Sequence, residues 1–153
     1  YEHYDMDILG YKCNMNNIQA SLLINQLDNI EHFLKKKEDI ARKYSQAFLR
    51  NSKINIPQVL PNSKHARHLY TIWVDPEKRD FYLHFLQQKG IGVAVNFRPI
   101  HLMSYYQNKY KFKKDDFPNA EKIGESTISI PLYPRLKRSE INYVIDTINE
   151  MVS

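Results

Sequence analysis

The residues best suited to chemistry lie in one short run, Val95-Asn96-Phe97-Arg98-Pro99-Ile100-His101. The guanidinium of Arg98 can bind a carboxylate or a phosphate through two parallel hydrogen bonds. The imidazole of His101 can donate or accept a proton near neutral pH. Because the run follows an apolar segment typical of a strand, the strand end would aim these side chains at a ligand. Asn96, Arg98 and His101 are therefore candidate binding residues, although the residue types alone leave an ordinary strand end open as the alternative.

A second candidate is a stretch that is both aromatic and basic, at residues 105–114. Aromatic rings can stack on bases while lysines hold phosphates, and the net charge of +5 suits an anionic partner. The alternative is a loop whose rings pack on a sheet while its lysines stay in water. We favour this alternative, and with it a protein that does not bind nucleic acid. The residues concerned are Tyr105, Tyr106, Lys109, Tyr110, Lys111, Phe112, Lys113 and Lys114.

Other chemistries are excluded by residue counts. The chain has four glycines, too few and too scattered for a G-x-G-x-x-G or Walker A phosphate loop. Its one cysteine, Cys13, allows neither an internal disulfide nor a cysteine-rich zinc site, and we expect an ordinary thiol there. His65 and His68 lack an evident third ligand, so we expect no metal. The chain has neither a signal peptide nor an apolar run of about 18 residues, so we expect a cytoplasmic, reducing setting and no membrane contact.

The elements that must position these residues begin with a long helix. From Asn16 onward, apolar residues recur three, four or seven positions apart, which predicts one helix over residues 17–49, with Asn16 or Asn17 as its N-cap. At about 1.5 Å per residue such a helix is roughly 50 Å long, more than a small domain needs. We therefore expect it to bridge to another domain or subunit. Its apolar stripe consists of Leu23, Leu27, Ile30, Leu34, Ala41, Tyr44 and Phe48.

After a loop that contains two prolines, the pattern alternates between short strands and helices. β-Branched and aromatic residues predict strands at 68–74, 92–97 and 127–130. This order predicts an α/β fold, in which the long helix is followed by a small α/β sandwich with a sheet of three or more short strands. Helices are predicted at about 76–89, 103–109 and 118–125 and from residue 139 onward.

Three blocks of this sequence carry a family resemblance. Residues 10–21 (GYKCNMNNIQAS) resemble a G-Y-x-Y-[NR]-[ML]-[TS]-[DE]-[IL]-Q-A-A block, residues 90–102 a G-I-x-x-x-V-H-Y-x-P-x-H-L segment, and residues 129–134 (SIPLYP) the end of an L-S-L-P-L-[YF]-P block. In this order and spacing the blocks are typical of the DegT/DnrJ/StrS family, the sugar-nucleotide aminotransferases that use pyridoxal phosphate. The chain is therefore similar to that family over nearly its whole length.

The resemblance implies one particular part of such an enzyme. Members have fold type I, and a large N-terminal domain holds the pyridoxal phosphate, its Schiff-base lysine and the Asp that pairs with the ring nitrogen. All of these lie upstream of the block that begins at Gly10. We therefore expect residues 1–16 to be the entry segment from a missing large domain, 17–49 the long interdomain helix, and 50–153 the small C-terminal α/β domain.

The resemblance also implies a reaction and site residues. The full enzyme would be a homodimer that transfers an amino group, typically from glutamate, to a nucleotide-linked keto-sugar. Asn14 matches a position that reaches the cofactor phosphate of the neighbouring subunit in several members. His101 matches the second histidine of a loop that lines the sugar-nucleotide cleft, and Asn96 stands where the family usually has the first.

We accordingly expect Asn14 to bind the cofactor and Asn96, Arg98 and His101 to bind substrate. No catalytic residue is expected in this segment, so the chain alone should be inactive and should not hold pyridoxal phosphate by itself. The alternative is a non-catalytic small domain that stands alone as an oligomerisation or binding module.

Overall fold

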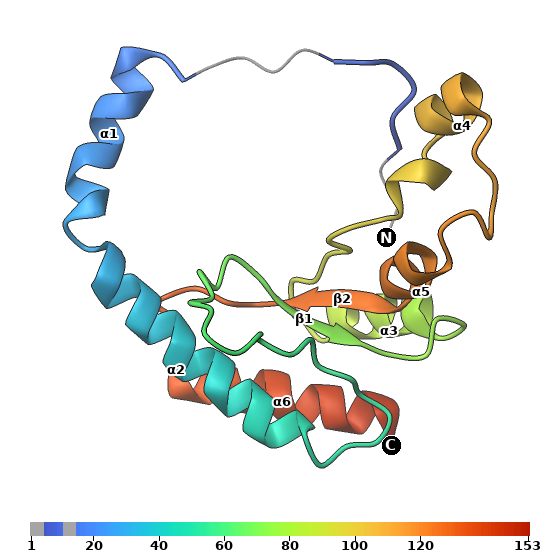
Figure 1. The fold of residues 1–153 in the computed structure, drawn as a ribbon. Helices are drawn as coiled ribbons and strands as arrows, with labels where there is room; N and C mark the ends of the chain where they lie inside the picture. Colours follow the sequence, from blue (N-terminus) through green and yellow to red (C-terminus); the bar gives the residue numbers. More distant parts are fainter. Residues whose placement is uncertain (1–4, 11–14) are drawn as a thin grey trace.

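The computed structural model describes residues 5–10 and 15–153 and shows a small sheet covered by helices (Figure 1). Two helices lead to the sheet, and strands and helices then follow one another along the chain. The α/β class predicted from the sequence is confirmed. The elements are α1 (Asn17–Leu27), α2 (Ile30–Phe48), β1 (Tyr70–Trp73), α3 (Arg79–Gln88), the 3-10 turn η1 (Ile100–Leu102), α4 (Ser104–Tyr110), α5 (Pro118–Ser126), β2 (Thr127–Ile130) and α6 (Arg138–Val152).

The continuous helix predicted over residues 17–49 is wrong, because the helix is interrupted at Asp28 and Asn29. Asn29 leaves the helical conformation, with φ of −104° and ψ of 0°, and its side-chain amide donates to a carbonyl one turn back at 3.2 Å. A short polar side chain of this kind competes with the helix backbone for its hydrogen bonds. The start of α1 is as predicted, since Asn16 caps it by accepting from the N–H of Gln19 at 2.9 Å.

The sheet in the described part of the chain consists of β1 and β2, paired antiparallel. Tyr70 lies opposite Ile130, and Trp73 lies opposite Thr127. On the outer edge of β1, Asn55 forms one bridge with Trp73 through two backbone hydrogen bonds of 2.8 Å. Every residue of β2 is buried, so both faces of this strand are covered.

The strand predicted at 92–97 is wrong, because this segment contributes only one bridge, between Ala94 and Ser129. The two residues exchange backbone hydrogen bonds of 3.2 and 2.8 Å. The next hydrogen-bonded pair in one direction along β2 would need an N–H from Pro131, which has none. The predicted sheet of three or more strands is therefore reduced to two strands with single bridges along their outer edges.

The core lies between the sheet and the helices α2, α3 and α6. α2 and α6 pack against each other on one side of the sheet (Figure 1). Tyr44 of α2 is fully buried, stacks on Phe48 and donates its hydroxyl to the carbonyl of Pro131 at 3.0 Å. Burial raises the pKa of the Tyr44 hydroxyl far above its usual value. The largest fully buried side chains are Tyr44, Phe48, Ile72, Leu83, Leu86, Ile128 and Ile148.

Candidate functional site

The turn after Val95 places the three predicted binding residues in different surroundings. Asn96 and Arg98 are half-buried at the surface of the turn. His101 lies in η1 and is only 6% exposed. The imidazole is therefore almost fully buried, although His101 and Arg98 both contribute to the lining of one hollow.

His101 is held by Glu121, a residue that the sequence did not single out. Its Nε2 lies 2.8 Å from Oε1 of Glu121, and Glu121 is itself only 4% exposed. Since an ionised carboxylate only accepts hydrogen bonds, the ring proton is placed on Nε2. The rings of Phe117 and Phe112 meet the imidazole edge-on at centroid distances of 4.8 and 6.5 Å. The imidazole is thus enclosed by a carboxylate and two aromatic rings.

The Glu121 carboxylate also gathers the loop that precedes α5. It accepts the backbone N–H of Asp115 at 2.9 and 3.1 Å and that of Phe117 at 3.4 Å. Burial alone raises the pKa of Glu121, but the hydrogen bonds from His101 and from these two N–H groups outweigh it, and the net pKa lies below the usual value. Glu121 is therefore an anion at neutral pH that accepts hydrogen bonds from three donor groups.

Gly124 lies three residues after Glu121 on α5. It contacts Pro99 in the candidate turn, which consists of residues 96–101. A Cβ at this position would lie 2.5 Å from Cδ of Pro99, so only glycine allows the approach. The buried guanidinium of Arg79 donates to the Gly124 carbonyl at 3.1 Å and pairs with Asp80 at 2.6 Å. α5 is thereby fixed to α3 on one side and to the candidate turn on the other.

The described N-terminal residues are tied to the same region. Asp5 accepts the backbone N–H of Ser104 at 2.9 Å and also its hydroxyl, and the carbonyl of Met6 accepts the N–H of Tyr105 at 2.7 Å. The hydrogen bonds from Ser104, with a smaller contribution from the charge of Arg98, lower the pKa of Asp5 to about 2. An anion at Asp5 therefore lies near the cation of the candidate turn.

The aromatic and basic stretch forms a row of stacked rings. Tyr106 stacks on Tyr110 at 6.0 Å, Tyr110 on Phe112 at 5.6 Å, and Phe112 meets Phe117 edge-on at 5.4 Å. The rings thus pack on one another, and the lysines of the stretch are exposed. A mostly apolar hollow of about 520 Å³ lies between this row and residues 97–101.

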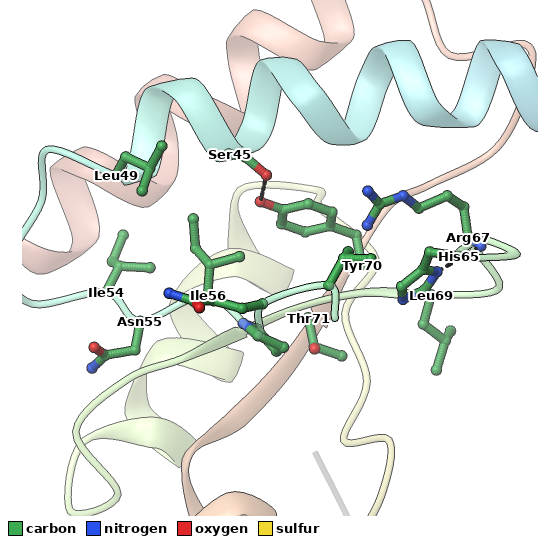
Figure 2. Close-up of a pocket in the computed structure, with 13 residues that line it drawn as sticks. Ser45, Leu49, Ile54, Asn55, Ile56, His65, Arg67, Leu69, Tyr70 and Thr71 are labelled. Atoms are coloured by element: carbon green, nitrogen blue, oxygen red, sulfur yellow. Dashed lines mark hydrogen bonds between the residues drawn. The ribbon is translucent and has the colours of Figure 1, made fainter. Parts of the chain in front are cut away.

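A second hollow, of about 540 Å³, lies between α2 and the segments before β1 (Figure 2). Ser45 and Tyr70 join their hydroxyls across it at 2.9 Å. Spacing could not have revealed it, because its walls come from three separate parts of the chain. The lining residues are Ser45, Leu49, Ile54, Asn55, Ile56, Pro57, Gln58, Val59, His65, Arg67, Leu69, Tyr70 and Thr71.

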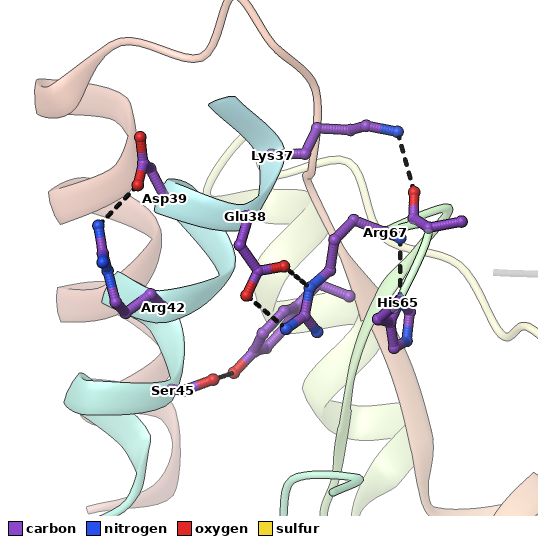
Figure 3. Close-up of polar contacts among 9 residues, drawn as sticks. Lys37, Glu38, Asp39, Arg42, Ser45, His65 and Arg67 are labelled. Carbon is purple, nitrogen blue, oxygen red and sulfur yellow. Dashed lines mark hydrogen bonds and ion pairs between the residues drawn. The ribbon is translucent and has the colours of Figure 1, made fainter. Parts of the chain in front are cut away.

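The charge at the edge of this hollow is neutralised within the protein (Figure 3). Arg67 donates to both carboxylate oxygens of Glu38, at 2.5 and 2.8 Å, and its backbone N–H donates to Nδ1 of His65 at 2.9 Å. This hydrogen-bonded pair lowers the pKa of Glu38 and raises that of Arg67. Lys37 donates to the carbonyl of Ala66 at 3.4 Å. The network holds the loop before β1 against α2. Because the guanidinium of Arg67 is already paired with Glu38, it is not free to bind a ligand.

The described residues contain neither a cluster of metal-ligating side chains nor a fully buried lysine. Over residues 5–10 and 15–153, no group of three His, Cys, Asp or Glu side chains could hold a metal ion. The lysines in these ranges are exposed, apart from the half-buried Lys37. Asn14, predicted to bind the cofactor, and Cys13 lie outside the described residues. No described helix has both the length and the apolar character needed to cross a bilayer.

Comparison with known proteins defines the class. The model of the DegT/DnrJ/EryC1/StrS aminotransferase family matches residues 1–149, so the chain belongs to this family and the resemblance seen in the three sequence blocks is confirmed. The protein MJ1066 of Methanocaldococcus jannaschii is 35% identical over 99% of this chain and 40% of its own length. The spore coat polysaccharide biosynthesis protein SpsC of Bacillus subtilis is 34% identical over 98% of this chain and 40% of its own.

Solved structures agree with this family. Spr1654 of Streptococcus pneumoniae, named as a sugar aminotransferase, superposes with a TM-score of 0.83 at 31% identity over 97% of this chain and 38% of its own. Spr1654 was solved in forms with pyridoxal phosphate and with pyridoxamine phosphate, and pyridoxal phosphate is the cofactor of the full enzymes of this family. The chain spans about two fifths of the length of the relatives that it matches.

Proposed function

We propose that this chain is the C-terminal small domain of a pyridoxal phosphate-dependent aminotransferase that passes an amino group from glutamate to a nucleotide-linked keto-sugar. The observation that carries the proposal is the family match over residues 1–149 combined with coverage of about 40% of the relatives. Pyridoxal phosphate, when bound, supplies the electron sink for the amino transfer. The Schiff-base lysine belongs to the part of the enzyme upstream of Tyr1, and the described lysines, exposed or half-buried, lack the apolar pocket that activates such an amine.

The division of the chain follows from the same proposal. Residues 1–16 enter from the large domain, 17–49 connect the domains through α1 and α2, and 50–153 form the small domain. α1 supports this division because it has no buried residue, although Ile18, Leu22 and Ile24 are large and apolar. A helix of 11 residues is marginal in water without packing of its apolar side. We assign that side to the large domain and to the second subunit of a homodimer.

Asn96 and Arg98 are the described side chains that we assign to the sugar nucleotide. Both are half-buried on the surface of the turn, where a ligand can reach them. Arg98 supplies a positive charge for a phosphate, as arginine does in many phosphate sites. Asn14 is assigned to the cofactor phosphate of the neighbouring subunit, where an amide N–H would add one hydrogen bond.

The role in the cell follows from the substrate. The relative SpsC is named for spore coat polysaccharide biosynthesis. We infer that the amino-sugar made by this enzyme likewise enters a surface polysaccharide or glycoprotein, and that the enzyme acts in the cytoplasm.

The test is an amino-transfer assay on the product of the longest reading frame that contains this sequence. The enzyme is incubated with pyridoxal phosphate, ¹⁵N-glutamate and a panel of nucleotide-linked keto-sugars, and products are identified by mass. We expect one keto-sugar to gain ¹⁵N, with 2-oxoglutarate formed in equal amount. A reading frame that ends at these 153 residues, or a full product that labels no keto-sugar, would favour the stand-alone module instead.

A further inference from the structure

We propose that Glu121 is a positioning residue for the sugar-nucleotide turn and that His101 acts as its anchor, not as a ligand of the substrate. This inference rests on the proposed function for the identity of the ligand. The anchoring itself rests only on contacts among described residues. We use the word template for Glu121 and Gly124 of α5, which contact residues 96–101 and fix their position. Asn96 and Arg98 would then face the substrate in a fixed geometry.

The template consists of two contacts one helical turn apart. Residues three apart on a helix lie on the same side, which places Glu121 and Gly124 side by side on α5. Glu121 holds His101 through the 2.8 Å hydrogen bond, and Gly124 lets the ring of Pro99 reach the helix backbone. The turn is thus fixed at positions 99 and 101, immediately after Arg98.

The same carboxylate holds a second segment, which makes it more than a partner for one imidazole. Loop residues 111–117 have positive φ at Lys111 (62°) and at Asp115 (75°), a conformation that most residues avoid. The N–H groups of Asp115 and Phe117 end on the Glu121 carboxylate, and the Phe117 ring then packs on the imidazole. Glu121 therefore links the aromatic row, the loop and the turn at one buried point.

Burial argues against direct contact between His101 and substrate. His101 is 6% exposed, and the Nε2 proton is already donated to a carboxylate. Drawing this imidazole to a ligand would leave the buried Glu121 carboxylate without this hydrogen-bond donor, which is costly inside a protein. A residue that acts through another in this way sets the geometry of a binding site without touching the ligand.

The anchoring is tested on the chain itself by amide hydrogen exchange. Glu121→Gln removes the charge at constant size, and the matched control is Glu125→Gln on the same helix, whose side chain makes no hydrogen bond or ion pair among the described residues. We expect Glu121→Gln to speed exchange at the amides of Asp115, Phe117, Leu102 and Met103 by about tenfold, the size of one lost hydrogen bond to a charged group. Exchange in α2 and α6 should stay unchanged, and Glu125→Gln should match the parent chain. Unchanged exchange at residues 102–103, or an equal rise throughout the core, would overturn the proposal.

The positioning role is tested in the amino-transfer assay. Glu121→Gln should raise the KM for the keto-sugar nucleotide about tenfold and leave the glutamate half-reaction within about twofold. His101→Gln, which keeps an N–H donor for the carboxylate, should retain most of the affinity that His101→Ala loses. A His101→Gln variant as impaired as His101→Ala would make the imidazole a ligand and contradict the anchor. If the parent enzyme aminates no keto-sugar, the proposed function fails, and the exchange experiment still decides the anchoring.

Discussion

Two short helices, α1 and α5, stand in opposite relation to the rest of the molecule. α1 carries large apolar side chains and buries none of them; Leu22 is 70% exposed. α5 buries a glutamate and a glycine because each has a specific partner, His101 and Pro99. The contrast shows that in these two helices burial depends on an available partner and not on hydrophobicity alone. α5 belongs to the fold of the described chain, whereas we propose that the apolar side of α1 packs on the large domain and the second subunit.

The largest expected effect is a difference in the free energy of unfolding between a substitution in the core and one in α1. Phe48→Ala empties a fully buried site and should lower the free energy of unfolding by about 3–5 kcal/mol. Leu22→Ala removes a side chain already in water and should change it by less than about 0.5 kcal/mol in this chain. Urea unfolding of both variants measures the difference. Similar losses in the two variants would show that α1 is packed within the chain after all.

The second effect concerns the close approach at α5. Gly124→Ala brings a methyl group into the ring of Pro99 and should destabilise the chain by about 1–3 kcal/mol while displacing residues 97–101. Gly92→Ala is the matched control, because a Cβ there has nothing within 4 Å. Thermal unfolding and amide shifts of the turn check both variants. If residues 97–101 are unperturbed in Gly124→Ala, the contact between Gly124 and Pro99 does not position the turn.

The third effect is local and depends on pH. The pKa of folded Glu121 lies below its usual value of 4.5, so the ionised carboxylate stabilises the turn fully above about pH 4.5. That stabilisation is lost as the pH falls through the folded pKa. We expect amide exchange at Asp115 and Phe117, corrected for intrinsic rates, to rise in that acid range and to be insensitive to it in Glu121→Gln. Loss of protection that begins well above pH 4.5 would assign the effect to another group.

The smallest effect is at Ser129. Its hydroxyl is buried in β2 and has no hydrogen-bond partner among the described residues. Ser129→Ala removes this unsatisfied group and should leave stability unchanged or raise it by up to about 1 kcal/mol. Thr127→Val serves as the contrast, because the Thr127 hydroxyl donates to the carbonyl of Ile123 at 2.6 Å. Urea unfolding that ranks Ser129→Ala below Thr127→Val would contradict the assignment.

Much of the fold could be predicted from local sequence patterns. The predictions that were wrong have physical causes. The N-cap at Asn16 and the approximate positions of α4, α5 and α6 follow directly from residue types. The break at residues 28–29 could not be seen, because Leu27 and Ile30 keep the helical spacing of the stripe across it. The segment 92–97 has the composition of a strand, but whether it pairs is decided by its distant neighbour Pro131.

The candidate site was predictable in place but not in its internal arrangement. Arg98 and His101 were found by residue type at a strand end. The burial of His101 depends on its contact with Glu121, which lies 20 residues beyond it in the sequence. No local spacing marks such a pair, since it forms only when α5 folds back on the turn. The ion pair of Arg67 with Glu38, 29 residues apart, escaped prediction for the same reason.

We propose above all that this chain carries the small domain of an aminotransferase and that the reactive lysine lies elsewhere in the enzyme. Reduction with borohydride after addition of pyridoxal phosphate, followed by peptide mapping, tests it most directly. For the chain of 153 residues we expect only sub-stoichiometric labelling spread over exposed lysines, and for the full product of the reading frame one fully labelled lysine upstream of Tyr1. A single, stoichiometrically labelled lysine within residues 1–153, together with turnover of a keto-sugar nucleotide by this chain, would contradict the account.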